Sequence, residues 1–273
     1  MHGLIKTGEI NHVNSRDIKT SRFGIGLEKV DRELYDPDPC YDPIAEIGVK
    51  WVRIQSGWPR TEKTRGAYDF SWLDSMVDNL VKRNLEPWIC LCYGNQLYTP
   101  GANNRTGGIG YPPISSAEEK GAWNSYVKAC VSRYKGKVNY FEVWNEPDGL
   151  YCWRYGVNAS EYGQFAKDTA IAAKEANPEA RILAASFCTA NLSYLNEMLT
   201  VCAQYIDYVT YHNYKFDVEK GTLDFYNAMR AVINIHNPKV GIIQGETGTQ
   251  SRYSEHGALR YADWNERRQA KYL

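Results

Sequence analysis

Residues 139–147, Asn-Tyr-Phe-Glu-Val-Trp-Asn-Glu-Pro, decide the fold of this chain. The first six are mostly aromatic or β-branched, a composition typical of a buried β-strand. Pro147 has no N–H to donate to a neighbouring strand, so the strand is predicted to stop before it. Glu146 is therefore expected at the carboxyl end of the strand, facing a loop-lined cleft. A carboxylate in that position is costly unless it is paired or functional.

A second acid has the same setting. Residues 240–246, Val-Gly-Ile-Ile-Gln-Gly-Glu, form another apolar run that closes on a carboxylate, Glu246. Two acids that each end an apolar strand indicate paired-carboxylate chemistry.

Strands and helices alternate along the chain. The apolar runs predict strands at 22–28, 51–56, 86–92, 139–146, 181–187, 206–214 and 239–246. Apolar residues at helical spacing predict helices at 70–84, 116–134 and 222–236. Two capping-box patterns, Ser115 before Glu118 and Asn158 before Glu161, mark helix starts.

Seven strand–helix units without a linker predict a (β/α)₈ TIM barrel. A doubly wound open sheet is the alternative, although Gly24-Ile-Gly26 lacks the third glycine of a dinucleotide-binding turn. Only 27 residues follow Glu246 (273 − 246), and they read as a loop and one helix at about 257–271. We therefore expect residues 1–21 to be an N-terminal extension and 22–273 a catalytic barrel. That barrel is expected to be truncated, without its eighth strand and helix.

Charge and hydropathy exclude several classes of partner. The net charge is zero, the pI is about 6.9 and no basic run is present, so nothing favours nucleic acid or an anionic membrane. No apolar run approaches the ~20 residues of a membrane span, and no signal peptide is visible, so a cytoplasmic protein is expected. Cys90 and Cys92 are interpreted as small core residues in a reducing compartment, because no matching Cys/His pair follows them.

Three separate stretches now support a resemblance. Trp144-Asn145-Glu146-Pro147, His212-Asn213-Tyr214 on the sixth predicted strand, and Glu246 resemble the clan A retaining glycoside hydrolases. The segments that look like glycoside hydrolase family 39 and its close relatives are 53–63, 66–74 and 87–95. The resemblance covers roughly residues 22–270.

The resemblance implies roles for the two acids. Glu146 would be the general acid/base, protonating the leaving oxygen and then deprotonating the incoming water. Glu246 would be the nucleophile that attacks the anomeric carbon.

The resemblance also implies supporting residues. Asn145 would hydrogen-bond the sugar 2-hydroxyl, and Tyr214 would orient Glu246. His212 and Arg53 would line the pocket floor, although the residues alone leave purely structural roles open for both, and for Tyr214. Glu142 is interpreted as a structural acid paired with a barrel arginine.

Aromatic and polar residues on the neighbouring loops complete the candidate site. Residues 93–116 form a long loop after the third predicted strand, on the catalytic face, and long loops are often functional. Further candidate sugar contacts, for which packing and stacking roles both remain open, are Trp58, Tyr93, Asn95, Trp144, Tyr151 and Trp153.

The sequence as a whole predicts a retaining O-glycosidase for a β-linked xyloside, glucoside or galactoside, with an oligosaccharide or glycoside as its partner. No metal or organic cofactor is expected. One alternative is a non-hydrolytic carbohydrate-binding barrel or inactive fragment. Another is a barrel hydrolase that uses the two acids as metal ligands, although no His/Asp cluster is visible in the sequence.

Overall fold

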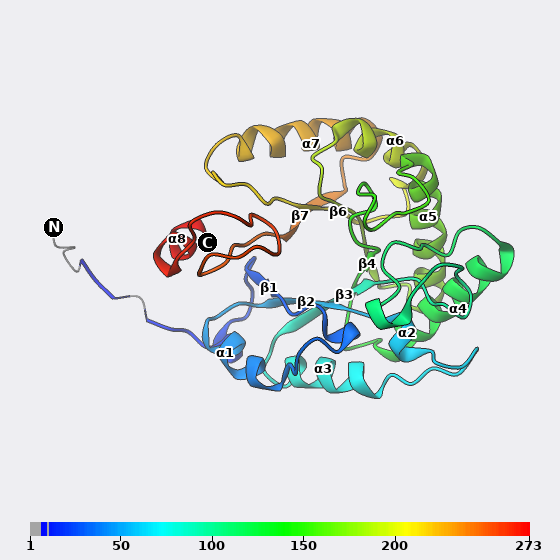
Figure 1. The fold of residues 1–273 in the computed structure, drawn as a ribbon, viewed down its shortest axis with the longest axis horizontal. Helices are drawn as coiled ribbons and strands as arrows, with labels where there is room; N and C mark the ends of the chain where they lie inside the picture. Colours follow the sequence, from blue (N-terminus) through cyan, green and yellow to red (C-terminus); the bar gives the residue numbers. More distant parts are fainter. Residues whose placement is uncertain (1–6, 10) are drawn as a thin grey trace.

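The computed structural model describes residues 7–9 and 11–273, and it consists of parallel strands that alternate with helices (Figure 1). The strands are β1 (Gly24–Gly26), β2 (Trp51–Gln55), β3 (Glu86–Leu91), β4 (Tyr140–Val143), β5 (Arg181–Phe187), β6 (Tyr208–His212) and β7 (Gly241–Glu246). All seven predicted strands are confirmed.

The strands are hydrogen-bonded in the order in which they occur, β1-β2-β3-β4-β5-β6-β7, and every pair is parallel. A doubly wound sheet would reverse its order at a switch point, so the sequential order confirms the barrel type. Within the described residues, β1 and β7 each pair on one side only, which leaves the barrel nearly closed. All seven carboxyl ends meet at one face.

Helices cover the outside of this sheet (Figure 1). They are α1 (Tyr41–Glu46), α2 (Trp58–Thr61), α3 (Ser71–Val81), α4 (Ala117–Arg133), α5 (Ala159–Ala176), α6 (Leu192–Cys202), α7 (Thr222–His236) and α8 (Glu266–Tyr272). The predicted apolar stripes pack inward: Leu73, Met76 and Leu80 of α3 are buried, as is Trp123 of α4. Burial of these faces against the sheet supplies the main stabilising free energy.

Several element boundaries differ from the prediction. β4 ends at Val143 and β6 at His212, so Glu146 and Tyr214 lie in the loops just beyond their strands. The last helix starts at residue 266 rather than near 257, because the polar, glycine-containing residues before it form turns. The cap at Asn158 is confirmed, since its side chain accepts a hydrogen bond from the N–H of Glu161. Helix α4 begins one residue later than predicted, with Ser116 as its cap.

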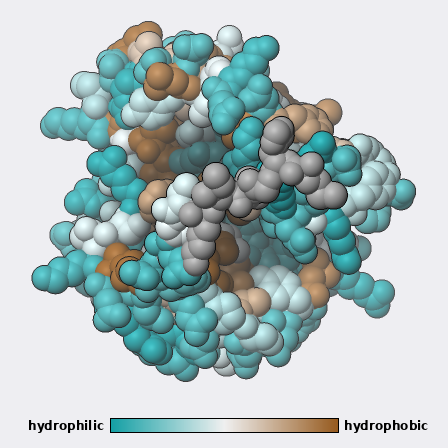
Figure 2. All heavy atoms as spheres, turned by 90° about the vertical axis from the view of Figure 1, so that its left-hand side faces the viewer, coloured by the Kyte–Doolittle hydropathy of each residue, from teal (hydrophilic) through white to brown (hydrophobic). Residues whose placement is uncertain are grey.

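The side of the molecule that carries α8 and the N-terminal segment is hollowed, with apolar groups visible in the hollow (Figure 2). Part of the predicted extension 1–21, namely residues 1–6 and 10, lies outside the described residues. The described part forms one short 3₁₀ turn, Ser15–Asp17, and no strand. Ser15 Oγ donates a 3.0 Å hydrogen bond to Ala45 O, which ties this turn to α1. None of the helices in the described ranges is long and apolar enough to cross a membrane.

Candidate active site

Arg53 of β2 is the centre of the cluster at the carboxyl face of the barrel. Its side chain is 2% exposed and donates to three carboxylates, two on other strands and one in the loop after β1. Nε lies 2.6 Å from Glu142 Oε2, and Nη1 lies 2.6 Å from Glu28 Oε1 and 2.5 Å from Glu246 Oε1. The predicted pairing of Glu142 with a barrel arginine is thus confirmed. One buried cation holds β2, β4, β7 and the residues after β1 together.

The two predicted catalytic acids face each other across His212. The Nδ1 atom of His212 lies 2.8 Å from Glu146 Oε1 and 3.6 Å from Glu246 Oε2. One carboxylate oxygen from each acid and one ring nitrogen of His212 all lie within 4.8 Å of one another. The side chains of Glu146 and Glu246 keep 25% and 16% exposure, so a ligand can reach both, whereas the His212 side chain is fully buried.

Glu246 is held in its charged form. Burial alone would raise its pKa, but the charges of Arg53 and His212 and hydrogen bonds from Tyr214 and Arg53 outweigh burial and lower the pKa below the ordinary value of 4.5. The phenolic hydroxyl of Tyr214 donates a hydrogen bond to Glu246 Oε2 at 2.9 Å. Glu28 behaves in the opposite way, because burial raises its pKa more than Arg53 lowers it.

A bulge in β5 supplies the support for His212. The register between β5 and β6 shifts between Ala185 and Phe187, and Ala185 and Ser186 both have positive φ angles, 81° and 45°. The extra residue leaves Ser186 Oγ 2.9 Å from His212 Nε2, and Arg53 Nη2 donates to the same oxygen at 3.4 Å. Bulges often re-aim a side chain next to an active site, and this one links Arg53 to His212.

The backbone at Glu146 is also unusual. Trp144 and Glu146 have φ angles of 67° and 48°, in the left-handed region that non-glycine residues rarely adopt. The N–H of Glu146 donates to Ser186 O at 3.1 Å, which fixes this conformation. Strained residues of this kind cluster at functional sites, where the surrounding structure over-determines them.

Two other predicted site residues lie at or next to the cluster. Asn145 Oδ1 accepts from Arg53 Nη2 at 2.9 Å, so Asn145 belongs to it directly. Tyr93 is buried at its edge, and its hydroxyl accepts from Gln55 Nε2 at 3.2 Å.

Four predicted residues, Trp58, Asn95, Trp144 and Trp153, lie outside the cluster. Trp144 packs edge-on against Trp123 and Trp153 beneath the site, and the Trp153 ring is likewise fully buried. Trp58 Nε1 donates to Glu62 Oε2 at 2.6 Å, and Asn95 Nδ2 donates to Glu62 O at 2.8 Å, which anchors the loop after β3. These side chains support the walls of the site and do not face the acids.

The cluster contains residues that sequence reasoning missed. Glu28 follows the apolar run at β1, which is the signal that identified the other two acids and could have identified this one. Ser186 carries no such signal, because its position depends on the bulge. Thr210 of β6, which donates to Glu142 Oε1 at 2.6 Å and accepts from the N–H of Ser186 at 3.0 Å, carries none either. Close packing explains the glycine at position 245. A Cβ there would lie 3.3 Å from the His212 ring, so the residue before Glu246 must be small.

Within the described part of the chain, Glu146, His212 and Glu246 form a group that could hold a metal ion. The sequence did not reveal this grouping, since His212 is far from both acids in the chain. The guanidinium of Arg53 lies 2.5 Å from Glu246 and already balances the negative charge of that carboxylate. These residues therefore suit a network of charged hydrogen-bonding groups better than a metal centre.

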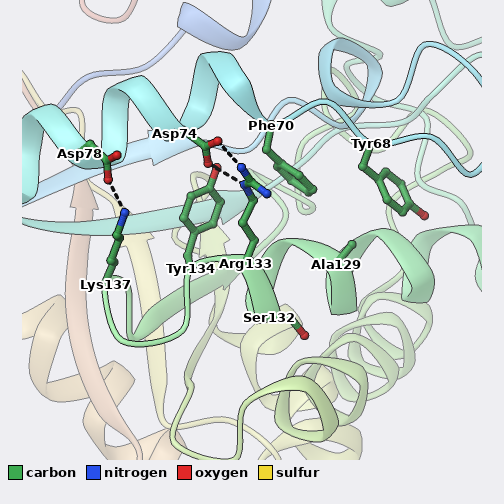
Figure 3. Close-up of a pocket in the computed structure, with 9 residues that line it drawn as sticks. All are labelled: Tyr68, Phe70, Asp74, Asp78, Ala129, Ser132, Arg133, Tyr134 and Lys137. Atoms are coloured by element: carbon green, nitrogen blue, oxygen red, sulfur yellow. Dashed lines mark hydrogen bonds and ion pairs between the residues drawn. The ribbon is translucent and has the colours of Figure 1, made fainter.

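A separate groove lies on the outer surface between α3 and the end of α4 (Figure 3). It has a volume of about 650 Å³, but its charged groups pair with one another. Arg133 contacts Asp74, and Lys137 Nζ lies 2.6 Å from Asp78 Oδ1. These pairs join α3 to the end of α4 and to the residues just after it.

Paired carboxylates on a parallel barrel, with an arginine, a histidine and a tyrosine around them, define the class of barrel glycoside hydrolases. The family model described as "Glycosyl hydrolases family 39" matches residues 40–243. Because the match covers more than half of the sequence, the chain belongs to glycoside hydrolase family 39.

Relatives agree with this assignment. The chain is 26% identical over 237 residues to a β-xylosidase of Geobacillus stearothermophilus, covering 77% of this chain and 44% of that protein. It is 28% identical over 149 residues to the β-galactosidase BgaA of Clostridium cellulovorans, covering 48% and 22%. A family 39 β-xylosidase structure from Caulobacter crescentus superposes with a TM-score of 0.68 at 18% identity, covering 91% and 58%. The chain therefore spans about half the length of the first relatives it matches.

Proposed function

We propose that this protein is a retaining glycosidase that hydrolyses a β-linked xyloside, glucoside or galactoside by double displacement. Glu246 is the nucleophile, and Glu146 is the general acid and then the general base. The sugars named in the relatives, xylose and galactose, support this range of substrates.

The spacing of the two acids carries the proposal. Their facing oxygens lie within 4.8 Å. Retaining enzymes hold the two carboxyl groups about 5–5.5 Å apart, whereas inverting enzymes leave about 6.5–9.5 Å for a water molecule. The short spacing favours direct attack by a carboxylate on the anomeric carbon.

The environments of the acids support different roles. Glu246, with its lowered pKa, is ready as an anion, as a nucleophile must be. Glu146 is hydrogen-bonded through Oε1 to His212, and the contact that its other oxygen makes among the described residues is with the weak donor Cys152 Sγ at 4.0 Å. Once the Glu246 ester forms, one negative charge leaves the site, and Glu146 can change from acid to base.

Replacement of each acid tests the assignment. Glu246→Ala is expected to abolish turnover of every aryl β-glycoside, because no nucleophile remains. Glu146→Ala is expected to keep most of the first step on a 2,4-dinitrophenyl glycoside, which needs no acid, and azide should restore turnover by replacing the water that needs a base. Steady-state kinetics and product analysis measure both.

The matched control is Glu142→Gln, which changes a third carboxylate on Arg53 without changing a proposed catalytic acid. Azide should not restore activity in this variant. Equal losses in Glu146→Ala on activated and unactivated substrates, without azide rescue, would contradict the assigned roles.

A further inference from the structure

The two oxygens of Glu146 have different neighbours. Oε1 lies 2.8 Å from His212 Nδ1, while the neighbour recorded for Oε2 is the weak donor Cys152 Sγ at 4.0 Å. On the other side of the imidazole, Ser186 Oγ accepts from Arg53 and has its own proton for His212 Nε2. Assigned from this network, Nδ1 of the imidazole carries a hydrogen and donates a hydrogen bond to Oε1.

This hydrogen bond decides from which side a leaving group is protonated. An oxygen that already accepts an N–H is the poorer position for the acid's own proton, so the transferable proton belongs on Oε2. Oε2 faces Cys152, which lies in the loop between β4 and α5. The leaving group must therefore depart over that loop.

The same loop carries exposed apolar side chains. Leu150 and Tyr151, which precede Cys152, are 68% and 65% exposed. Tyr155 is also exposed. Exposed apolar groups gathered beside a polar site mark binding surfaces more often than isolated ones do.

The ring of Tyr151 packs against a cation. The guanidinium of Arg154 lies 5.6 Å from the Tyr151 ring centroid and 5.5 Å from that of Tyr111, on the loop after β3. The two loops are joined, because the N–H of Arg154 donates to Gly110 O at 2.8 Å. A Cβ on Gly110 would lie 2.5 Å from Tyr151 O, so the approach of the loops leaves no room for a side chain there. The backbones of the two loops are thus held close together beside the Tyr151 ring.

We propose that Tyr151, packed against the guanidinium of Arg154, is the aglycone-binding platform, and that the substrate carries a ring aglycone, either a second sugar or an aryl group. The apolar face of such a ring packs on Tyr151 while its glycosidic oxygen meets Oε2 of Glu146. This inference rests on the proposed glycosidase function and adds the side of departure and the kind of leaving group.

Substitution of Tyr151 tests the platform with three substrates that share the preferred sugar. Tyr151→Ala is expected to lower kcat/KM by about tenfold for the 4-nitrophenyl glycoside and for the β-linked disaccharide, because one aromatic contact is lost. The glycosyl fluoride, whose aglycone is a single atom, should change less than about twofold on the same reasoning. Tyr151→Phe, which keeps the ring face, should retain wild-type values for all three. A loss confined to the aryl substrate or to the disaccharide identifies which ring the platform takes.

Tyr205→Ala is the matched control. Tyr205 is also an exposed tyrosine against a cation, with Lys167 Nζ 5.0 Å from its ring centroid, but it lies before β6 at the opposite end of the barrel. It should alter none of the three substrates. Equal loss on the fluoride and the ring aglycones, or no loss on any of them, would overturn the platform. If the wild-type protein hydrolyses none of the three, the glycosidase proposal itself fails, so the two failures are distinguishable.

Discussion

At the residue scale, Glu246 and Tyr214 show how a buried acid stays charged. Burial on its own would raise the pKa of Glu246, and the cation of Arg53 and the phenolic donor of Tyr214 reverse that effect. The proposed nucleophile is therefore an anion because of its partners, and loss of one partner should change the pH range of the reaction.

Tyr214→Phe tests this dependence. The substitution removes one hydrogen bond to the charged carboxylate, so the pKa of Glu246 should rise. Activity requires ionised Glu246 and is lost as the pH falls through its pKa. The acidic limb of the kcat/KM profile should therefore move to higher pH.

The basic limb serves as the internal control, because it reports on the group that must stay protonated. A Tyr214→Phe profile that is lower throughout, with an unmoved acidic limb, would show that Tyr214 only packs against the site.

At the element scale, Arg53 connects strands that are distant in the sheet. Carboxylates from the loop after β1, from β4 and from β7 converge on its guanidinium. Removing a cation from a buried group of this kind leaves carboxylates without a counter-ion and is strongly destabilising.

Arg53→Met is expected to lower the free energy of unfolding at pH 7 by more than about 3 kcal/mol. Arg53 lowers the pKa of both Glu28 and Glu246, so both pKa values should rise in the variant. When the pKa of an acid is higher in the folded state than in the unfolded state, the acid destabilises the fold at pH values above the folded-state pKa. This destabilisation disappears below the unfolded-state pKa. The deficit relative to wild type should therefore shrink as the pH falls from 7 towards 4.5, as measured by chemical denaturation.

Arg133→Met is the control, since its partner Asp74 is a surface acid and such pairs contribute about 0–1 kcal/mol. A deficit for Arg53→Met that stays constant or grows on acidification would contradict this account of the cluster.

The same scale shows what a sequence can reveal. The strands and the acids Glu146 and Glu246 were predictable, because apolar runs mark buried strands and each acid closes one. Ser186 was not, since its orientation depends on a bulge that only pairing between strands defines. Trp58 was ambiguous because an aromatic ring that packs in a core and one that stacks on sugar look alike in sequence.

At the scale of the whole molecule, the side chains proposed to form the active site all lie within the described residues. Arg53 lies on β2, Glu146 follows β4, His212 ends β6 and Glu246 ends β7. The chain spans about half the length of the β-xylosidases it resembles, 44% of one and 58% of another, and β1 and β7 each pair on one side only within the described range. The acid pair is thus assembled by this chain, and its reactivity can be tested directly.

The most direct test is to trap the intermediate with 2-deoxy-2-fluoro β-xyloside, β-glucoside and β-galactoside carrying a good leaving group. The fluorine slows hydrolysis of a glycosyl-enzyme, so mass spectrometry of the digested protein can locate it. We predict one added sugar on the peptide that contains Glu246, with at least one of the three reagents. No adduct with any reagent, or an adduct on Glu146, would contradict double displacement with Glu246 as the nucleophile.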